Sequence, residues 1–362
     1  MNLLRLIITT YIPLITAYQH PIILVPGLGG SVLKNVQNSE KVWPPNYRWI
    51  FRKDEWERKM YIDVNTTTGT ISYDKLIQSP PLGSRNSVRI VNKVTSWLLG
   101  NVYYNRILDY LPTDILYVIP YDFRLVGFDF YLNDLFIRLK TFIEERNEKC
   151  DIICHSLGGL VFHLFLLNYV DDTWKEKHIS KTIFVNVPFG GAVTTIENMI
   201  SKELTFNKKV KLNFLENFSG FLWCLPNKEV FKNNTVLVVN GSHYDCESTL
   251  SVLPNFCKTS ILLTKYLQDK RKLVIKPPIK KCYIIYSVGI ETVSKVIVDN
   301  KAVSTEYVDG DGVVPTESLL LPKTWNSTVI FIKLLGEHSR ILSDNTFLNT
   351  LTSILKDELF VT

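Results

Sequence analysis

The chain has 362 residues, of which 46% are hydrophobic and 21% are charged. This composition excludes a disordered or low-complexity protein, because it supplies enough apolar surface to build a core. Lys and Arg number 41 against 35 Asp and Glu, which gives a net charge of +6. So mild an excess fits attraction to an anionic surface, but it does not indicate a nucleic-acid-binding protein, which needs a dense basic face.

The N-terminus has the features of a secretory signal peptide. A short segment with one positive charge, Arg5, precedes the apolar residues 6–17, which end at the small residue Ala17. This apolar stretch is too short to span a bilayer as a helix, and no later segment is long enough either. We therefore expect cleavage after residue 17 and a product that is secreted or lies in an endomembrane or lysosomal lumen. An uncleaved anchor and a buried first strand are the alternatives.

Six short apolar runs predict strands that are buried on both faces, as in a parallel sheet. They are residues 22–25, 115–119, 151–154, 182–187, 283–288 and 329–335. Segments with apolar side chains at helical spacing lie between them, as in residues 132–143. This alternation predicts one α/β domain over residues 18–362, with a mostly parallel central sheet covered by helices. Residues 43–87 and 203–280 interrupt the pattern, and we interpret them as a lid insertion and a cap insertion.

Six cysteines are present, and none forms a C-x-x-C pair, so a zinc knuckle is not indicated. In an oxidising compartment some should pair, most plausibly among Cys224, Cys246 and Cys257. Sequons that would fit a secreted glycoprotein occur at Asn65, Asn217, Asn233, Asn240 and Asn326.

The sharpest local feature is the segment 154–159, Cys-His-Ser-Leu-Gly-Gly, between a predicted strand and a predicted helix. This is the context of a nucleophile elbow, in which a tight strand-to-helix turn exposes a serine hydroxyl. Gly158 meets the need for a small residue two positions after Ser156, whereas Cys154 stands where glycine is usual. The alternative is an ordinary turn.

A serine nucleophile needs a histidine base that a carboxylate orients, and in this fold class they follow in the order Ser, acid, His. Of the six histidines, only His338 follows a late predicted strand. Asp311, between two glycines, is the favoured acid, and Asp309 is the rival. A calcium loop would also use Asp-x-Asp, but the remaining EF-hand positions are missing. An ordinary surface histidine is the alternative for His338.

Acyl transfer at a serine also needs backbone donors for an oxyanion. One donor is usually the N–H after the nucleophile, here Leu157. The second should come from the loop after an early strand, and residues 26–31, Pro-Gly-Leu-Gly-Gly-Ser, follow the first strand. A glycine-rich loop can instead bind phosphate, but G-x-G-x-x-G and Gly-Lys-Ser/Thr are both absent from the sequence.

Together these motifs resemble the lecithin–cholesterol acyltransferase family, which includes lysosomal phospholipase A. The collinear segments are residues 21–27 (PIILVPG), 120–125 (PYDFRL), 155–159 (HSLGG), 188–191 (PFGG), 310–313 (GDGV) and 337–338 (EH). The resemblance implies an α/β-hydrolase fold, a catalytic triad of Ser156, Asp311 and His338, and an oxyanion hole of the Leu28 and Leu157 N–H groups. The family's short first disulfide has no counterpart here, because no cysteine precedes Cys150.

The resemblance and the triad predict a serine acyl hydrolase or O-acyltransferase that acts on glycerophospholipids without metal or cofactor. Its partners would be a phospholipid substrate, a membrane or lipoprotein surface, and water, an alcohol or a sterol as acyl acceptor. Aromatic clusters in residues 43–56 and 218–223 would suit lipid contact, although ordinary packing is the alternative. The competing functions are a neutral-lipid or small-ester lipase and an inactive lipid-binding protein.

Overall fold

The computed structural model describes residues 18–45, 47–65, 68, 70–89, 103–205, 209–211, 215, 218–257 and 261–358. The predicted signal peptide, residues 1–17, lies outside the described residues. Among the helices that the model describes, none is both long enough and apolar enough to cross a membrane.

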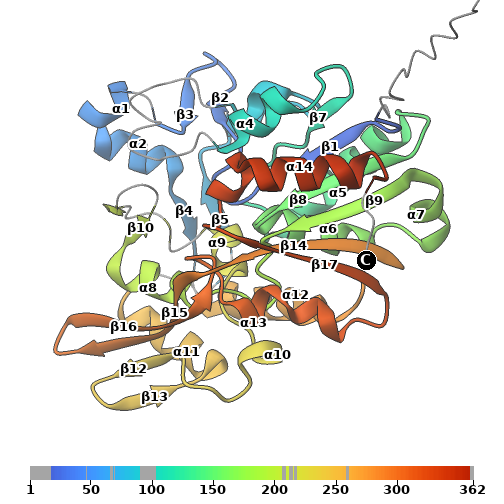
Figure 1. Ribbon diagram of the computed structural model, residues 1–362. Coiled ribbons are helices and arrows are strands. Elements are labelled where there is room, and N and C mark those ends of the chain that lie inside the picture. The colour runs from blue at the N-terminus through green and yellow to red at the C-terminus, as the bar shows by residue number, and fades with distance from the viewer. Residues whose placement is uncertain are drawn as a thin grey trace, which may run out of the picture.

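A six-stranded sheet forms the centre of the molecule (Figure 1). Its strand order is β17-β14-β9-β8-β1-β7, and every neighbouring pair is parallel. The strands are β1 (Ile22–Val25), β7 (Leu116–Val118), β8 (Cys150–His155), β9 (Ile179–Val185), β14 (Lys281–Val288) and β17 (Thr328–Leu335). All six predicted runs are strands of this sheet, and the α/β-hydrolase fold is confirmed.

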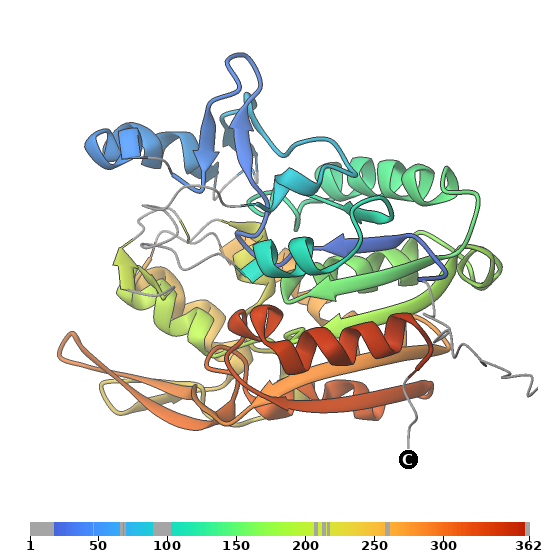
Figure 2. The ribbon, with the colours of Figure 1, turned by 45° about the horizontal axis from the view of Figure 1, so that its top comes forward.

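Side chains alternate along the buried strands and pack on both faces of the sheet. Ile23 and Val25 of β1 belong to one hydrophobic cluster, whereas Ile22 and Leu24 belong to another. The first cluster includes side chains of α5 (Asp129–Glu144) and α6 (Leu157–Asn168). The second includes those of α4 (Tyr103–Tyr110) and α14 (Asn345–Leu355). The two helix pairs therefore cover opposite faces (Figures 1 and 2). Shorter helices are α7 (Asp172–His178), α8 (Thr194–Ser201) and α13 (Thr316–Leu319).

The predicted lid stretch lies outside the central sheet (Figure 2). Its elements are α1 (Tyr47–Phe51), α2 (Lys53–Met60), β4 (Ile62–Val64), β5 (Ile71–Tyr73) and β6 (Ile77–Gln78). Two strands just before the stretch, β2 (Leu33–Asn35) and β3 (Lys41–Trp43), form a small sheet with β6. The guanidinium of Arg124, which is fully buried, pairs with Asp122 and donates to the carbonyls of Lys59 and Ile77, each at 3.0 Å. The PYDFRL motif therefore attaches this stretch to the core.

The predicted cap stretch contains α9 (Ser219–Trp223), α10 (Lys228–Phe231), β12 (Leu237–Val239), β13 (Ser242–Tyr244), α11 (Cys246–Val252) and α12 (Ile261–Lys272). Its two strands β12 and β13 join a long hairpin, β15 (Ile290–Asp299) and β16 (Ala302–Gly310), in a second, four-stranded sheet. The sequence predicted the strand that precedes this hairpin, residues 283–288, but it did not predict the hairpin itself. The hairpin matters for the site because β16 ends one residue before Asp311.

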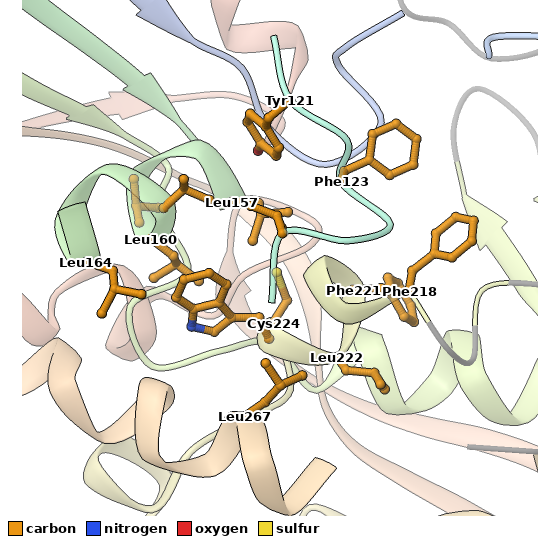
Figure 3. Packing of buried hydrophobic residues seen from close by; sticks show 14 of the residues in the cluster. Tyr121, Phe123, Leu157, Leu160, Leu164, Phe218, Phe221, Leu222, Cys224 and Leu267 are labelled. Atoms are coloured by element: carbon orange, nitrogen blue, oxygen red, sulfur yellow. The ribbon is translucent and has the colours of Figure 1, made fainter. Parts of the chain in front are cut away.

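The aromatic side chains that were candidates for lipid contact are mostly buried. Phe218, Phe221, Leu222 and Trp223 are at most 3% exposed. Figure 3 shows Leu222 beside Leu267 of α12 and Phe218 on the side of Phe123. In the lid stretch, the Trp43, Trp49 and Trp56 side chains are also buried, whereas Phe51 is 86% exposed. The expectation of exposed aromatic clusters is therefore wrong except at Phe51, because the other rings are buried where the cap and the lid pack against the core.

The structure does not contain the predicted disulfide. All six cysteines lie in the described part of the chain, all are buried, and all are thiols. The Cys224 thiol donates to the Gly220 carbonyl at 3.5 Å, and the Cys257 thiol donates to the Leu253 carbonyl at 3.4 Å. Each sulfur thus contacts the preceding helical turn, and the cysteines pack as small apolar side chains.

Candidate active site

The sharp turn between β8 and α6 carries Ser156 at the carboxyl end of the central sheet. Its backbone has φ 53° and ψ −130°, a strained conformation for a residue with a side chain. The elbow packs so closely on the loop after β1 that a Cβ atom at Gly158 would lie 2.4 Å from the Pro26 carbonyl oxygen. Glycine is therefore required at this position. Cys154, which occupies the usual glycine position, is fully buried within β8 and is accommodated there. The segment is therefore the predicted strand–turn–helix elbow.

Ser156, His338 and Asp311 form one hydrogen-bonded array. The Ser156 Oγ lies 2.9 Å from the His338 Nε2, and the His338 Nδ1 lies 2.6 Å from the Asp311 Oδ2. A carboxylate can only accept, so in a neutral ring Nδ1 carries the proton and Nε2 accepts from the serine hydroxyl. All three residues are at least 90% buried. The array thus has the order and the polarity that proton transfer from the serine requires.

The structure distinguishes Asp311 from its rival, Asp309. The Asp311 carboxylate is fully buried, and its Oδ1 accepts from the N–H groups of Val313 at 3.0 Å and Val314 at 2.7 Å. These two bonds leave Oδ2 directed at the histidine ring. The carboxylate of Asp309 instead accepts from the Gly289 N–H and the Thr316 hydroxyl. Asp311, as the sequence favoured, is the carboxylate that the fold brings to His338.

The predicted oxyanion donors lie next to Ser156. The loop after β1 packs against the elbow, since a Cβ atom at Gly27 would lie 2.8 Å from the Ser156 Cβ. Within the described part of the chain, the Leu28 and Leu157 N–H groups donate to no backbone carbonyl. The Trp43 indole holds the same loop by donating to the Gly29 carbonyl at 2.7 Å. Two backbone donors are therefore available beside the serine.

A cavity of about 440 Å³ opens above Ser156 and His338. Apolar side chains from four parts of the chain line it, among them those of Leu28, Phe221, Val293 and Val314. Charged side chains also line it, namely Glu197, Glu291, Glu337 and Arg340. A cavity of this size with an apolar lining suits a hydrophobic chain, and the charged groups suit a polar head.

Metal chemistry has no donor set here among the described residues. In that part of the chain, no group of three or more His, Cys, Asp or Glu side chains could hold a metal ion. The array itself supplies a hydroxyl, an imidazole and a carboxylate, from Ser156, His338 and Asp311.

Sequence reasoning passed over two residues that contact the base. His155 was set aside because it precedes the serine, yet its Nε2 lies 3.1 Å from the His338 carbonyl oxygen. The Asn186 Nδ2 donates to the same carbonyl at 3.0 Å. His155 is the last residue of β8, and Asn186 directly follows β9, at the edge of the sheet that carries the serine. Their position at the ends of predicted strands was the sequence signal that could have found them.

The fold and this array define the class: an α/β-hydrolase-fold protein with a buried Ser–His–Asp arrangement. A family model described as "Lecithin:cholesterol acyltransferase" matches residues 54–249, more than half of the chain. The chain therefore belongs to the lecithin:cholesterol acyltransferase family, as its motifs predicted.

Similar proteins extend this result beyond the matched segment. "Lecithin-cholesterol acyltransferase-like 4" of Arabidopsis thaliana is 27% identical and covers 92% of this chain and 75% of its own length. "Phosphatidylcholine-sterol acyltransferase" of Mus musculus is 25% identical, over 85% of this chain and 77% of its own. "Lysosomal phospholipase A and acyltransferase" of Rattus norvegicus is 25% identical, over 66% of this chain and 61% of its own.

Among solved structures, a chain in "The crystal structure of Tle4-Tli4 complex" superposes with a TM-score of 0.62. The match covers 93% of this chain and 98% of that chain, at 10% sequence identity. At so low an identity the likeness is one of fold.

Proposed function

We propose that this protein is a serine-dependent acyl hydrolase or O-acyltransferase that acts on glycerophospholipids through an acyl-enzyme on Ser156. The observation that carries the proposal is the buried array, with 2.9 Å between Ser156 Oγ and His338 Nε2 and 2.6 Å between His338 Nδ1 and Asp311 Oδ2. Family membership supports lipid acyl chemistry as the class of reaction.

In the first half-reaction, the Ser156 oxygen attacks the ester carbonyl while the His338 Nε2 takes the hydroxyl proton. Asp311 stabilises the imidazolium that forms, and the Leu28 and Leu157 N–H groups stabilise the oxyanion. The tetrahedral intermediate collapses, the imidazolium returns its proton to the leaving alcohol oxygen, and a lysophospholipid departs. The acyl group remains on the serine.

In the second half-reaction, His338 takes a proton from an incoming hydroxyl, which attacks the acyl-enzyme. The bond between the acyl carbon and the Ser156 oxygen then breaks, and the imidazolium returns its proton to that oxygen. Water as acceptor gives a free fatty acid, and an alcohol or a sterol gives a new ester. The relative from Mus musculus is named for a sterol acceptor and the relative from Rattus norvegicus for phospholipase activity. Both acceptors are therefore part of the proposal.

The apolar lining of the cavity supports an acyl chain as the group that lies next to the serine. The substrate would come from a membrane or lipoprotein surface, which the protein contacts peripherally. The exposed ring of Phe51 supports such contact. We also propose that the protein works in a secretory, endomembrane or lysosomal lumen after removal of residues 1–17, on the basis of the apolar stretch 6–17. N-terminal sequencing of the secreted or lumenal form tests this.

Covalent labelling by a fluorophosphonate tests the proposed nucleophile. The wild-type protein should be labelled on Ser156, and Ser156→Ala should abolish labelling and lower kcat by about 10⁵-fold or more, as loss of a triad serine does elsewhere. Circular dichroism of the variant checks that it is folded. Turnover that survives in folded Ser156→Ala would refute the assignment, and a folded wild type that is never labelled would favour an inactive lipid-binding protein.

Substrate preference separates the two enzyme alternatives. Fatty acid release is measured from phosphatidylcholine vesicles and from triacylglycerol emulsions, each with the Ser156→Ala variant as blank. Faster release from the vesicles supports the proposal, whereas release from the emulsions alone would identify a neutral-lipid lipase. Addition of a sterol or a long-chain alcohol to the vesicles, followed by product analysis, identifies the acceptor.

A further inference from the structure

A second histidine, His155, lies beside the proposed catalytic base. It is 3% exposed, and its ring centroid lies 5.2 Å from that of His338. Burial, with a smaller contribution from the charge that His338 can carry, lowers the pKa of His155 to about 3. The proton-transfer steps above do not use this ring, although it is the immediate neighbour of Ser156 in the chain.

The hydrogen bonds of His155 have one consistent set of directions. The His338 carbonyl can only accept, so His155 Nε2 carries the proton that it donates over 3.1 Å. In a neutral ring Nδ1 is then an acceptor, and it receives the Tyr104 hydroxyl proton over 2.8 Å. The Tyr104 oxygen in turn accepts the Gly27 N–H at 2.7 Å. A directed chain thus runs from the loop after β1 to the main chain of the base.

The two ends of this chain are the two parts of the site that must be aligned. At one end, Gly27 immediately precedes Leu28, the proposed oxyanion donor, and a Cβ atom at residue 27 would lie 3.0 Å from His155 Nδ1. At the other end, the His338 carbonyl accepts from both His155 and Asn186, and the His338 N–H donates to the Asp311 carbonyl at 2.8 Å. The backbone of the base is therefore held at three points.

We propose that Tyr104 and His155 are positioning residues that couple the oxyanion loop to the catalytic base through this hydrogen-bond chain. The inference rests on the proposed function and adds two residues to its machinery. The pair touches neither the ester nor the reacting atoms; it fixes the distance between the groups that do. Small misplacements of such groups cost large factors in rate, about 10²-fold for roughly 1 Å.

A neutral ring suits this role better than a charged one. A cation at His155 would oppose the imidazolium that His338 becomes during the reaction, because like charges at this spacing repel in a buried site. Burial lowers the pKa of His155 to about 3 and so keeps its ring neutral at neutral pH. The site thus contains two adjacent histidines with different tasks.

Three substitutions separate the links of the chain. Tyr104→Phe removes the hydroxyl that joins Gly27 to His155 and leaves the ring in place. In His155→Gln the amide nitrogen can occupy the Nε2 position and still donate to the His338 carbonyl. In His155→Asn the shorter amide can still accept from Tyr104 but cannot reach that carbonyl. Each variant is compared with the wild-type protein by kcat, KM and the rate of fluorophosphonate labelling, per folded molecule.

We expect Tyr104→Phe to lower kcat about tenfold and His155→Asn to lower it about 10²-fold, with KM within about twofold of wild type. His155→Gln should recover most of the activity lost in His155→Asn. The double variant Tyr104→Phe/His155→Asn should be no slower than His155→Asn alone, because both residues act in one chain.

Multiplicative effects in the double variant would overturn the coupling, as would unchanged kcat in folded Tyr104→Phe. A structural role alone would lower stability equally in all three variants without changing kcat per folded molecule. If the His155 variants do not fold, Tyr104→Phe alone decides the question. Loss of the inference leaves Ser156 labelling intact, whereas failure of the proposed function removes that labelling from the wild-type protein itself.

Discussion

The candidate active site and the cap are both buried, yet different forces hold them. At the site, polar side chains lie in the interior, and those of His155, Asp311 and His338 all have hydrogen-bond partners. In the cap, apolar packing dominates, and within the described chain the side-chain atoms Trp223 Nε1, Thr249 Oγ1 and Arg271 Nε are buried without a partner. Hydrogen bonds are directional and packing is not, so geometry should be sensitive at the site and stability should be sensitive in the cap.

Among the substitutions that compare the two regions, the largest expected effect is at the carboxylate that orients the base. Asp311→Asn keeps the shape but removes the charge and offers His338 the wrong hydrogen-bond pattern, so kcat should fall about 10⁴-fold, as for the equivalent change in a serine protease triad. Asp309→Asn is the matched control and should change kcat less than about threefold. Ester turnover measures both. Equal losses in the two variants would show that the acid is assigned to the wrong residue.

A cap substitution should have the opposite signature. Leu222 is fully buried beside Leu267 of α12 (Figure 3) and does not line the cavity. Leu222→Ala should lower the free energy of unfolding by about 3 kcal/mol, through lost burial and a new cavity, and leave kcat per folded molecule nearly unchanged. Denaturant unfolding and ester turnover test this together. A large loss of kcat with intact stability would contradict the division between the two regions.

Two buried histidines, His155 and His163, should make the fold sensitive to acid. Burial lowers the pKa of His155 to about 3 and that of His163, whose Nε2 donates to the Lys276 carbonyl at 2.9 Å, to about 4. The unfolded chain, with a histidine pKa of 6.5, therefore binds protons first, and stability is lost as pH falls below about 6.5.

Near pH 5, each histidine should contribute a slope of about 1.4 kcal/mol per pH unit. His155→Gln and His163→Gln should each reduce the slope of unfolding free energy against pH by about that amount. Of the two, only His155→Gln should lower kcat, and by much less than His155→Asn, because its amide can still donate to the His338 carbonyl. An unchanged slope in either variant would mean that its imidazole is protonated in the folded protein.

The smallest effect is expected at the surface. Phe51→Ala should weaken binding to phosphatidylcholine vesicles about fivefold, because partial burial of one ring in lipid contributes on the order of 1 kcal/mol. Val36, another exposed apolar residue at 53%, gives the control variant Val36→Ala. Vesicle sedimentation measures binding, and stability should stay within about 0.5 kcal/mol in both variants. Equal binding by Phe51→Ala and wild type would remove Phe51 from the lipid-contacting surface.

Local patterns predicted the parts of this molecule that local patterns control. Continuous apolar runs identified all six central strands. Strands such as β1 and β8 are buried on both faces and have no polar alternation, whereas the edge strand β17 is apolar in sequence although its side chains are partly exposed. The elbow at Ser156 was readable because its turn needs small residues at fixed offsets. Chain order then identified His338, and the fold brings it to the serine.

What depends on distant contacts could not be read in this way. The cysteines in an expected oxidising compartment suggested a disulfide, yet all of them are thiols. The aromatic clusters suggested exposed rings, yet most of those rings are buried. The β15–β16 hairpin was missed because its partner strand, β12, lies some fifty residues earlier in the chain.

The sequence by itself determined the order of the strands along the chain, the turn that carries the serine, and the residue types for a nucleophile, a base and an acid. Only the tertiary structure decided that Asp311 rather than Asp309 meets His338, and that Tyr104 and His155 link the loop to the base. The physical reason is that hydrogen-bond partners here are separated by 27 to 183 positions along the chain. A partner at such separation is chosen by how strands and helices pack.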